Sequence, residues 1–189
     1  TPGSAINTAS LAGQTVIIQF RRICTGYGCD GSAETFGTVA SWMVVADPTA
    51  PTLNVATPAS GTTICVGQDL SATFNVGSGG VGCADEYQVS TNGGTNYTAY
   101  TPGSAINTAS LAGQTVIIQT RRICTGDGCD GSAETFGTVA SWTVVADPTA
   151  PTLNVATPGS GTTVCVGQDL SATFNAGSGG VGCTDEYQV

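Results

Sequence analysis

The sequence contains no lysine and no histidine, and its only basic side chains are four arginines among 189 residues. It therefore lacks the commonest general base, the usual activator of a nucleophile and the imidazole ligands of zinc. The adjacent carboxylates Asp85 and Glu86 would point to opposite faces of a strand, which is poor geometry for shared acid–base chemistry. We therefore expect no enzymatic activity.

Other features that the sequence lacks narrow the range of partners that the protein could bind. Only 9% of the residues are charged and the net charge is −9, which argues against binding to nucleic acid. No segment approaches the roughly eighteen apolar residues of a membrane helix, so we expect no membrane span in this sequence. No signal peptide is visible, which we attribute to the absence of the true N-terminus. The absence of lysine also excludes a Lys–Asn isopeptide bond, so covalent reinforcement would have to come from cysteine.

What the sequence does contain is an internal repeat with a period of 100 residues. Residues 1–89 align without gaps on residues 101–189, with seven differences. These are Phe20/Thr120, Tyr27/Asp127, Met43/Thr143, Ala59/Gly159, Ile64/Val164, Val76/Ala176 and Ala84/Thr184. Such a period is the signature of a tandem array. Pairs such as Phe20/Thr120 place an apolar group in one copy only, which would mark contact patches that alternate along an assembly.

A proline-rich segment recurs with the repeat. Asp47–Leu53 returns letter for letter as Asp147–Leu153, and its two prolines predict an extended, semi-rigid linker. A repeat of about 100 residues is long enough to fold alone. The expected divisions are the C-terminal part of one repeat (1–46), a complete repeat (50–146) and the N-terminal part of the next (150–189), joined by linkers 47–51 and 147–151. The incomplete parts should complete one another or be completed by neighbouring chains.

Short apolar–polar alternations separated by turn residues predict strands in the complete repeat. We expect them at 52–57, 69–76, 86–90, 96–100, 115–124 and 135–145. Asn92-Gly93-Gly94 predicts a tight hairpin turn, because glycine and asparagine accept positive φ. Seven or so strands with frequent turns predict an all-β fold, an antiparallel β-sandwich.

Two sets of apolar residues are candidates for its core. Leu70, Ala72, Phe74 and Val76 share one face of their strand. Trp142 alternates with Val144, as Trp42 does with Val44 in the earlier copy, and we expect both tryptophans in a core.

Four motifs suggest a known repeat style. They are Cys-x-Gly-x-x-x-x-Ala-Thr-Phe (65–74), Gly-Ser-Gly-Gly-x-Gly-Cys-x-Asp (77–85), Tyr-x-x-Ser-Thr-Asn-Gly-Gly (87–94) and Trp-x-Val-Val (142–145). Together they resemble the immunoglobulin-like tandem repeats of very large bacterial surface adhesins and extracellular fibre proteins. The resemblance covers the whole chain and implies surface display with mechanical or adhesive work.

We therefore expect a structural subunit of a secreted bacterial filament or adhesin stalk that self-associates through its repeated surface. The cysteine content favours an oxidising compartment, consistent with an extracellular, cell-surface location. The alternative is a glycan- or cell-binding adhesin module, for which a shallow groove lined by Tyr87, Tyr97 and Tyr100 would serve.

The eight cysteines fall as four per repeat, which allows three pairings. They are Cys24, Cys29, Cys65, Cys83, Cys124, Cys129, Cys165 and Cys183. Because Cys124 and Cys129 flank a glycine-rich turn, we favour that local pair together with Cys65–Cys83. The rival pairing joins Cys83 to Cys124 across adjacent strands and leaves Cys65 for Cys129 or for the next repeat. A zinc site of four thiolates is disfavoured because no Cys-x-x-Cys knuckle is present.

The remaining candidate sites are polar. In a sandwich of this order the strand at 86–90 pairs antiparallel with the strand at 115–124, so Asp85 or Glu86 should form a salt bridge with Arg121 or Arg122. Arg21 and Arg22 would need acidic partners from another segment or chain.

Carboxylates near the linker are candidate ligands for Ca²⁺, which would stiffen the joint. They are Asp47, Asp85, Asp127, Asp130, Glu134 and Asp147, and the competing interpretation is a solvated acidic rim. Asn96-Tyr97-Thr98 matches a glycosylation sequon at Asn96.

Overall fold

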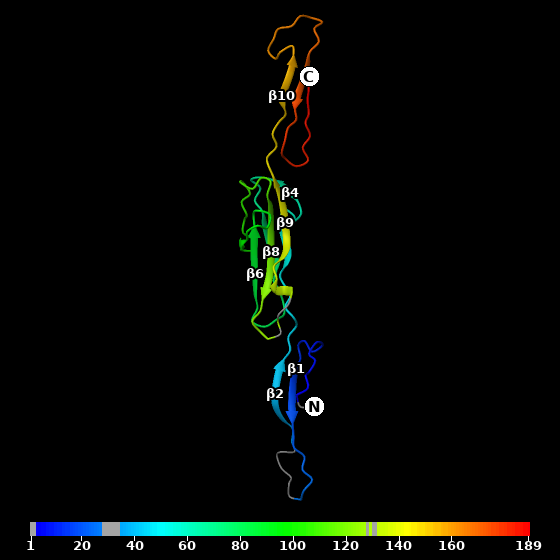
Figure 1. Cartoon of the computed structure of the whole chain (residues 1–189), viewed down its shortest axis with the longest axis vertical. Helices are drawn as coiled ribbons and strands as arrows, with labels where there is room; N and C mark the ends of the chain where they lie inside the picture. Colours follow the sequence, from blue (N-terminus) through cyan, green and yellow to red (C-terminus); the bar gives the residue numbers. More distant parts are fainter. Residues whose placement is uncertain (1–2, 28–34, 128, 130–131) are drawn as a thin grey trace. The chain divides into compact units, whose positions relative to one another are not determined.

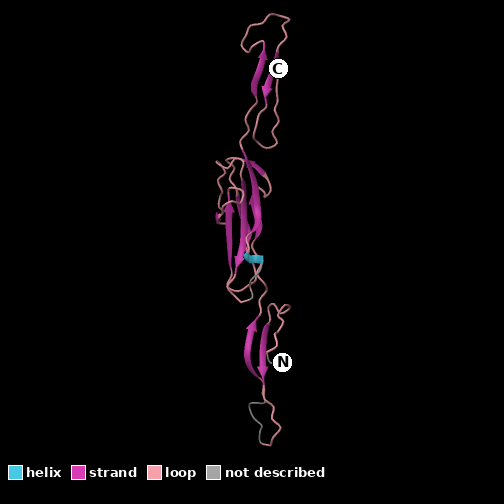
Figure 2. Cartoon of the chain, in the orientation of Figure 1, coloured by secondary structure: helices cyan, strands magenta, loops and turns pink. Residues whose placement is uncertain are grey.

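The computed structural model describes residues 3–27, 35–127, 129 and 132–189. These residues form an all-β structure with one short 3₁₀ turn, η2 (Ser132–Glu134) (Figure 2). The strands are β1 (Thr15–Phe20), β2 (Gly37–Met43), β3 (Thr52–Thr57), β4 (Thr63–Cys65), β5 (Ser71–Asn75), β6 (Ala84–Ser90), β7 (Thr98–Ala99), β8 (Thr115–Ile123), β9 (Gly137–Val145), β10 (Thr152–Thr157) and β11 (Ser171–Asn175). In this described part, no helix has the length and apolar character needed to cross a membrane.

The chain divides into two compact units. Unit 1 comprises Thr1–Ala50, Gly77–Asp85 and Arg122–Thr135; unit 2 comprises Pro51–Val76, Glu86–Arg121 and Phe136–Val189. This division by contacts does not follow the repeat boundaries expected from the sequence. It assigns linker residues up to Ala50 to unit 1, together with the loops before β6 and after β8.

The complete repeat contains two sheets. Strands β4, β9, β8, β6 and β7 form one sheet in that order, and β3 pairs with β5 in the other (Figure 1). β8 and β9 are antiparallel, with Val116 opposite Trp142. β4 runs parallel to β9, with Cys65 opposite Val145. The sequence did not predict this parallel pair, because three residues are too few to show a period.

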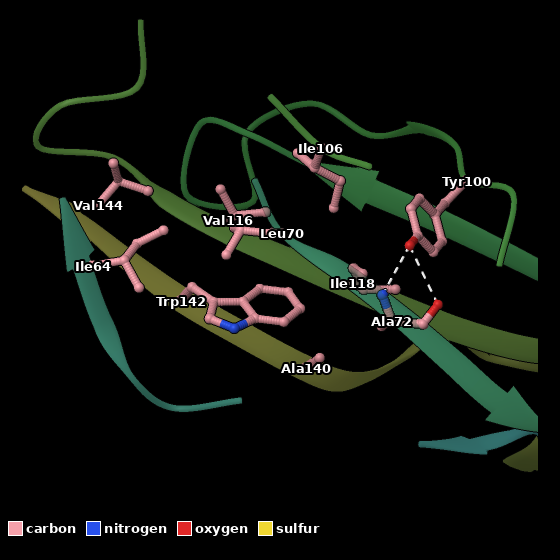
Figure 3. Close-up of a cluster of buried hydrophobic side chains, with 10 residues drawn as sticks. All are labelled: Ile64, Leu70, Ala72, Tyr100, Ile106, Val116, Ile118, Ala140, Trp142 and Val144. Atoms are coloured by element: carbon pink, nitrogen blue, oxygen red, sulfur yellow. Dashed lines mark hydrogen bonds between the residues drawn. The ribbon is translucent and has the colours of Figure 1, made fainter. Parts of the chain in front are cut away.

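The core of unit 2 lies on the apolar faces of these strands (Figure 3). Val116 and Ile118 of β8, Trp142 and Val144 of β9, and Leu70 and Ala72 beside or in β5 are all at most 2% exposed. The alternation along β8 and β9 explains this set, since every second side chain points to the same face. The expected place of Trp142 is confirmed, and its indole Nε1 donates a hydrogen bond to the Pro58 carbonyl (2.9 Å).

Two expected core residues, Val76 and Trp42, are not buried. Val76 is 81% exposed, although Leu70 and Ala72 on the same predicted face are in the core. β5 ends at Asn75, so the alternation that buries its residues does not extend to Val76.

Equivalent residues outside the complete repeat lack this cover. In unit 1, β1 and β2 pair in the same register as β8 and β9, yet Trp42 is 52% exposed whereas Trp142 is 1% exposed. In unit 2, β10 and β11 repeat the pairing of β3 and β5, yet Leu170 is 68% exposed whereas Leu70 is fully buried. The same local sequences therefore form the same hairpin-like pairs while their apolar faces stay open.

These differences predict unequal costs for one substitution made in two copies. Leu70→Ala should lower the free energy of unfolding by about 2–5 kcal/mol, because it leaves a cavity in a packed core. Leu170→Ala should change it by less than about 0.5 kcal/mol, since that side chain is exposed. Urea unfolding of the full chain at a dilution where it is monomeric measures both. Equal losses in the two variants would contradict the assignment of the core.

Candidate functional site at the loop that receives the linker

The loop Gly77–Cys83, which we call the receiving loop, binds the linker through its backbone. Thr49 N donates to Ser78 O (2.8 Å) and Ser78 N donates to Thr49 O (3.1 Å), while Gly80 N donates to Ala46 O (2.8 Å). The hydroxyls of Thr49 and Ser78 are also hydrogen-bonded (2.8 Å). The linker is therefore held by hydrogen bonds, which the sequence alone did not reveal.

The same set of bonds recurs one repeat later, within unit 2. Thr149 N donates to Ser178 O (2.7 Å), Ser178 N donates to Thr149 O (3.2 Å) and Gly180 N donates to Ala146 O (2.8 Å). Two copies of the motif thus adopt one geometry, which makes this docking a property of the repeated sequence.

Two glycines make the close approach of the linker feasible. Gly79 and Gly80 have φ of 69° and 71°, a backbone conformation that residues other than glycine rarely adopt. A Cβ at Gly79 would overlap the Asp47 carbonyl oxygen, and one at Gly80 would overlap the sulfurs of Cys83 and Cys124. The Gly-Gly pair in the sequence motif is therefore required by packing as well as by backbone conformation.

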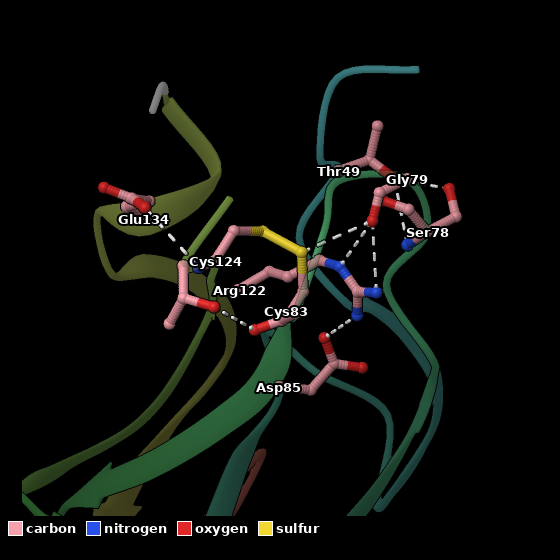
Figure 4. Close-up of a disulfide and its surroundings, with 10 residues drawn as sticks. Thr49, Ser78, Gly79, Cys83, Asp85, Arg122, Cys124 and Glu134 are labelled. Carbon is pink, nitrogen blue, oxygen red and sulfur yellow. Dashed lines mark hydrogen bonds and ion pairs between the residues drawn. A yellow bond between two sulfur atoms is a disulfide. The ribbon is translucent and has the colours of Figure 1, made fainter. Parts of the chain in front are cut away.

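The side chains of Arg122 and Asp85 bind each other and the backbone of the receiving loop (Figure 4). Arg122 Nη1 contacts Asp85 Oδ1 at 2.6 Å, and Arg122 Nε and Nη2 donate to the Gly79 carbonyl at 3.3 and 3.2 Å. Asp85 Oδ2 accepts a bond from Gly77 N (2.9 Å). Both side chains are largely buried, with 16% and 14% of their surfaces exposed. The ion pair therefore holds the start and the middle of the loop.

A second ion pair follows in unit 2. Arg121 Nη2 lies 2.7 Å from Glu86 Oε2, and the Arg121 guanidinium stacks over the Phe136 ring at 4.2 Å. This pair is more exposed, at 31% for Arg121 and 44% for Glu86. The salt bridges expected from the sequence are thus present for both carboxylates. In unit 1, Arg21 stacks in the same way over Phe36, at 4.5 Å.

The disulfide corrects the pairing favoured from the sequence. Cys83 is bonded to Cys124, so the local pairs Cys124–Cys129 and Cys65–Cys83 are wrong (Figure 4). The reason is register: β6 and β8 are neighbours in the sheet, and the two cysteines continue the alignment that places Asp85 opposite Arg122. Closing a loop of this length (sequence separation 41) lowers the entropy of the unfolded chain, which raises its free energy by about 4 kcal/mol in the chain-entropy account.

Five of the other cysteines lie in the described part of the chain, and Cys29 lies outside it. Cys65 is half-buried and Cys129 is buried, whereas Cys24, Cys165 and Cys183 are exposed. Cys65, Cys129, Cys165 and Cys183 are thiols in this structure.

The candidate calcium ligands do not form a cluster among the described residues. Nowhere in that part of the chain do three acidic or cysteine side chains gather in a way that could hold a metal ion. Asp85 uses both carboxylate oxygens on Arg122 and Gly77, and Asp130 lies outside the described residues. Calcium at Asp47, Asp127, Glu134 or Asp147 remains a prediction.

The other polar candidates separate into surface and core. Asn96 is exposed, as a glycosylation acceptor must be. Tyr100 is buried, and its hydroxyl accepts a bond from Ala72 N (3.0 Å) and donates to Ser104 O (2.9 Å). Tyr87 packs against Phe74 with ring centroids 5.0 Å apart. Tyr100 therefore belongs to the core, and the half-buried Tyr87 packs at its margin.

No protein-family model matches the chain, and no curated protein or solved structure matches it either. The interpretation of its function therefore depends on the sequence pattern and the geometry described above.

The contrast between the two ion pairs can be tested with isosteric substitutions. Asp85→Asn should lower the free energy of unfolding by about 1.5–3 kcal/mol, because it removes a charged partner from a largely buried Arg122. Glu86→Gln is the matched control at the next position and should cost less than about 1 kcal/mol, since its ion pair is more exposed to solvent. Urea denaturation of the full chain compares the two. An equal or larger loss for Glu86→Gln would contradict the role given to Asp85.

Proposed function

We propose that this chain is a structural subunit of a secreted bacterial extracellular filament or adhesin stalk, built from tandem immunoglobulin-like β-sandwiches. In this proposal the chain performs no catalysis, and its incomplete repeats are completed by neighbouring segments with the same sequence. The repeated surface then allows an open, self-associating assembly.

One observation carries the proposal: residues buried in the complete repeat are exposed in the incomplete ones. Ile18 and Trp42 are open, while their counterparts Ile118 and Trp142 are in the core. In the complete repeat the cover includes Leu70, whose own counterpart Leu170 is also open. The chain thus carries both halves of an apolar contact, each exposed, and such faces mark interaction sites.

The docked linker supports the same proposal. Backbone bonds from Ala46 and Thr49 to the receiving loop recur at Ala146 and Thr149, so successive repeats share one kind of joint. An array with uniform, hydrogen-bonded joints is stiffer than one with free linkers. Stiffness is the mechanical property that a stalk or filament needs.

A charge introduced on the apolar face of β1 tests the proposal. Ile18→Asp should abolish concentration-dependent assembly of the full chain, because it places a carboxylate in the expected core of a completed repeat. Ile17→Asp is the matched control: its side chain points to the opposite face, as that of the half-buried Ile117 does in β8. Sedimentation velocity and electron microscopy follow the assemblies, with and without a calcium chelator.

The expected result is assembly of the parent chain and of Ile17→Asp, but not of Ile18→Asp. Equal assembly of all three variants, or a strictly monomeric parent chain at high concentration, would contradict the proposal. Binding of a monomeric chain to a glycan array would instead support an adhesive module.

A further inference from the structure

A buried thiol lies beside the end of β2. Cys129 is only 5% exposed and contributes to a pocket of unit 1. That pocket is lined also by Thr8, Val45, Asp47, Val81 and Asp127. Val45 follows β2 by two residues, so the Cys129 thiol is placed where the free end of this strand leads into the linker.

The complete repeat shows what should pair with the end of β2. β9, the counterpart of β2, is bordered by the parallel strand β4, with Ile64 opposite Val144 and Cys65 opposite Val145. Val66 N donates to the Val145 carbonyl (3.0 Å). Among the described residues β2 is paired with β1 alone and ends at Met43, two residues before the position at which β9 ends. A strand paired with this edge as β4 is paired with β9 would carry a cysteine opposite Val45.

We propose that residues 163–165 of a second copy of this chain dock along this edge of β2, and that Cys165 of that copy forms a disulfide with Cys129. Cys165 is the counterpart of Cys65 and is an exposed thiol. Paired strands place opposite Cα atoms about 5 Å apart. A disulfide joins Cα atoms about 4.4–6.8 Å apart, and Val45, opposite which Cys165 would lie, lines the same pocket as Cys129. The inference rests on the proposed completion of one copy by another.

The chemistry is thiol–disulfide exchange with a small-molecule disulfide, represented in the test by oxidised glutathione. The thiolate of Cys165 attacks the oxidant and releases one glutathione thiolate, forming a mixed disulfide. The thiolate of Cys129 then displaces the second glutathione. The two protein thiols lose two protons and two electrons, and the oxidant is reduced to two thiols. The bond would join two copies at the joint that follows each completed repeat.

An equal mixture of ¹⁴N- and ¹⁵N-labelled full chains, oxidised with glutathione disulfide and then alkylated, tests this linkage. Cleavage after glutamate gives peptide 87–134, which contains Cys129 and stays joined to peptide 35–86 through Cys83–Cys124, and peptide 135–186, which contains Cys165 and Cys183. Mass spectrometry should find these peptides linked, with one partner from each isotope pool. Cys165→Ser should remove at least nine-tenths of this species, and Cys83–Cys124 should persist. Ile18→Asp should remove it as well, because docking is blocked.

The outcomes separate the two proposals. Assemblies that sediment but lack the mixed-isotope Cys129–Cys165 peptide would overturn the disulfide and leave the proposed function standing. A link found only within one isotope pool would overturn the contact between copies. A parent chain that neither assembles nor cross-links would overturn both.

Discussion

The burial of Leu70 and Ala72 against β8 and β9 is the interaction on which the rest of the structure depends. Val116, Ile118, Trp142 and Val144 form an apolar face that the sheet cannot hide by itself, and the cover comes from residues placed well before it in the chain. Each fully buried side chain of this kind contributes about 1.5–3 kcal/mol. Where the cover is lacking, at Trp42, the strands still pair but the face stays open. Strand pairing at β1 and β2 therefore occurs without burial of their apolar face.

A second constraint is the alignment of β6 with β8. One register places Gln88 against Gln119, Glu86 against Arg121, Asp85 against Arg122 and Cys83 against Cys124. The last two pairs lie beside the receiving loop and fix it. Arg122 reaches the Gly79 carbonyl, and the loop in turn bonds Thr49 of the linker. The less exposed ion pair of this weakly charged chain thus fixes the loop that binds the linker.

Much of this could be predicted from the sequence, and the failures have physical reasons. The strands, the Asn92-Gly93-Gly94 turn and the arginine–carboxylate pairs follow from period, turn chemistry and antiparallel order. The disulfide was missed because short loops were favoured, although the register that pairs Asp85 with Arg122 leads two residues further to Cys83 and Cys124. β4 was missed because three residues carry no period, and its parallel partner is distant in the chain. The linker's bonds to Ser78 and Gly80 are non-local, so composition predicted its extension but not its docking.

The environment of Trp42 gives the most direct test of completion. In a Trp142→Phe variant that retains its far-UV circular dichroism, Trp42 is the sole tryptophan. The account predicts that acrylamide quenches its fluorescence strongly in dilute solution, where the side chain is exposed, and weakly once the chain is concentrated enough to assemble. Trp42 that remains fully accessible to acrylamide inside the assembled particles would contradict the claim that one copy covers the open face of another.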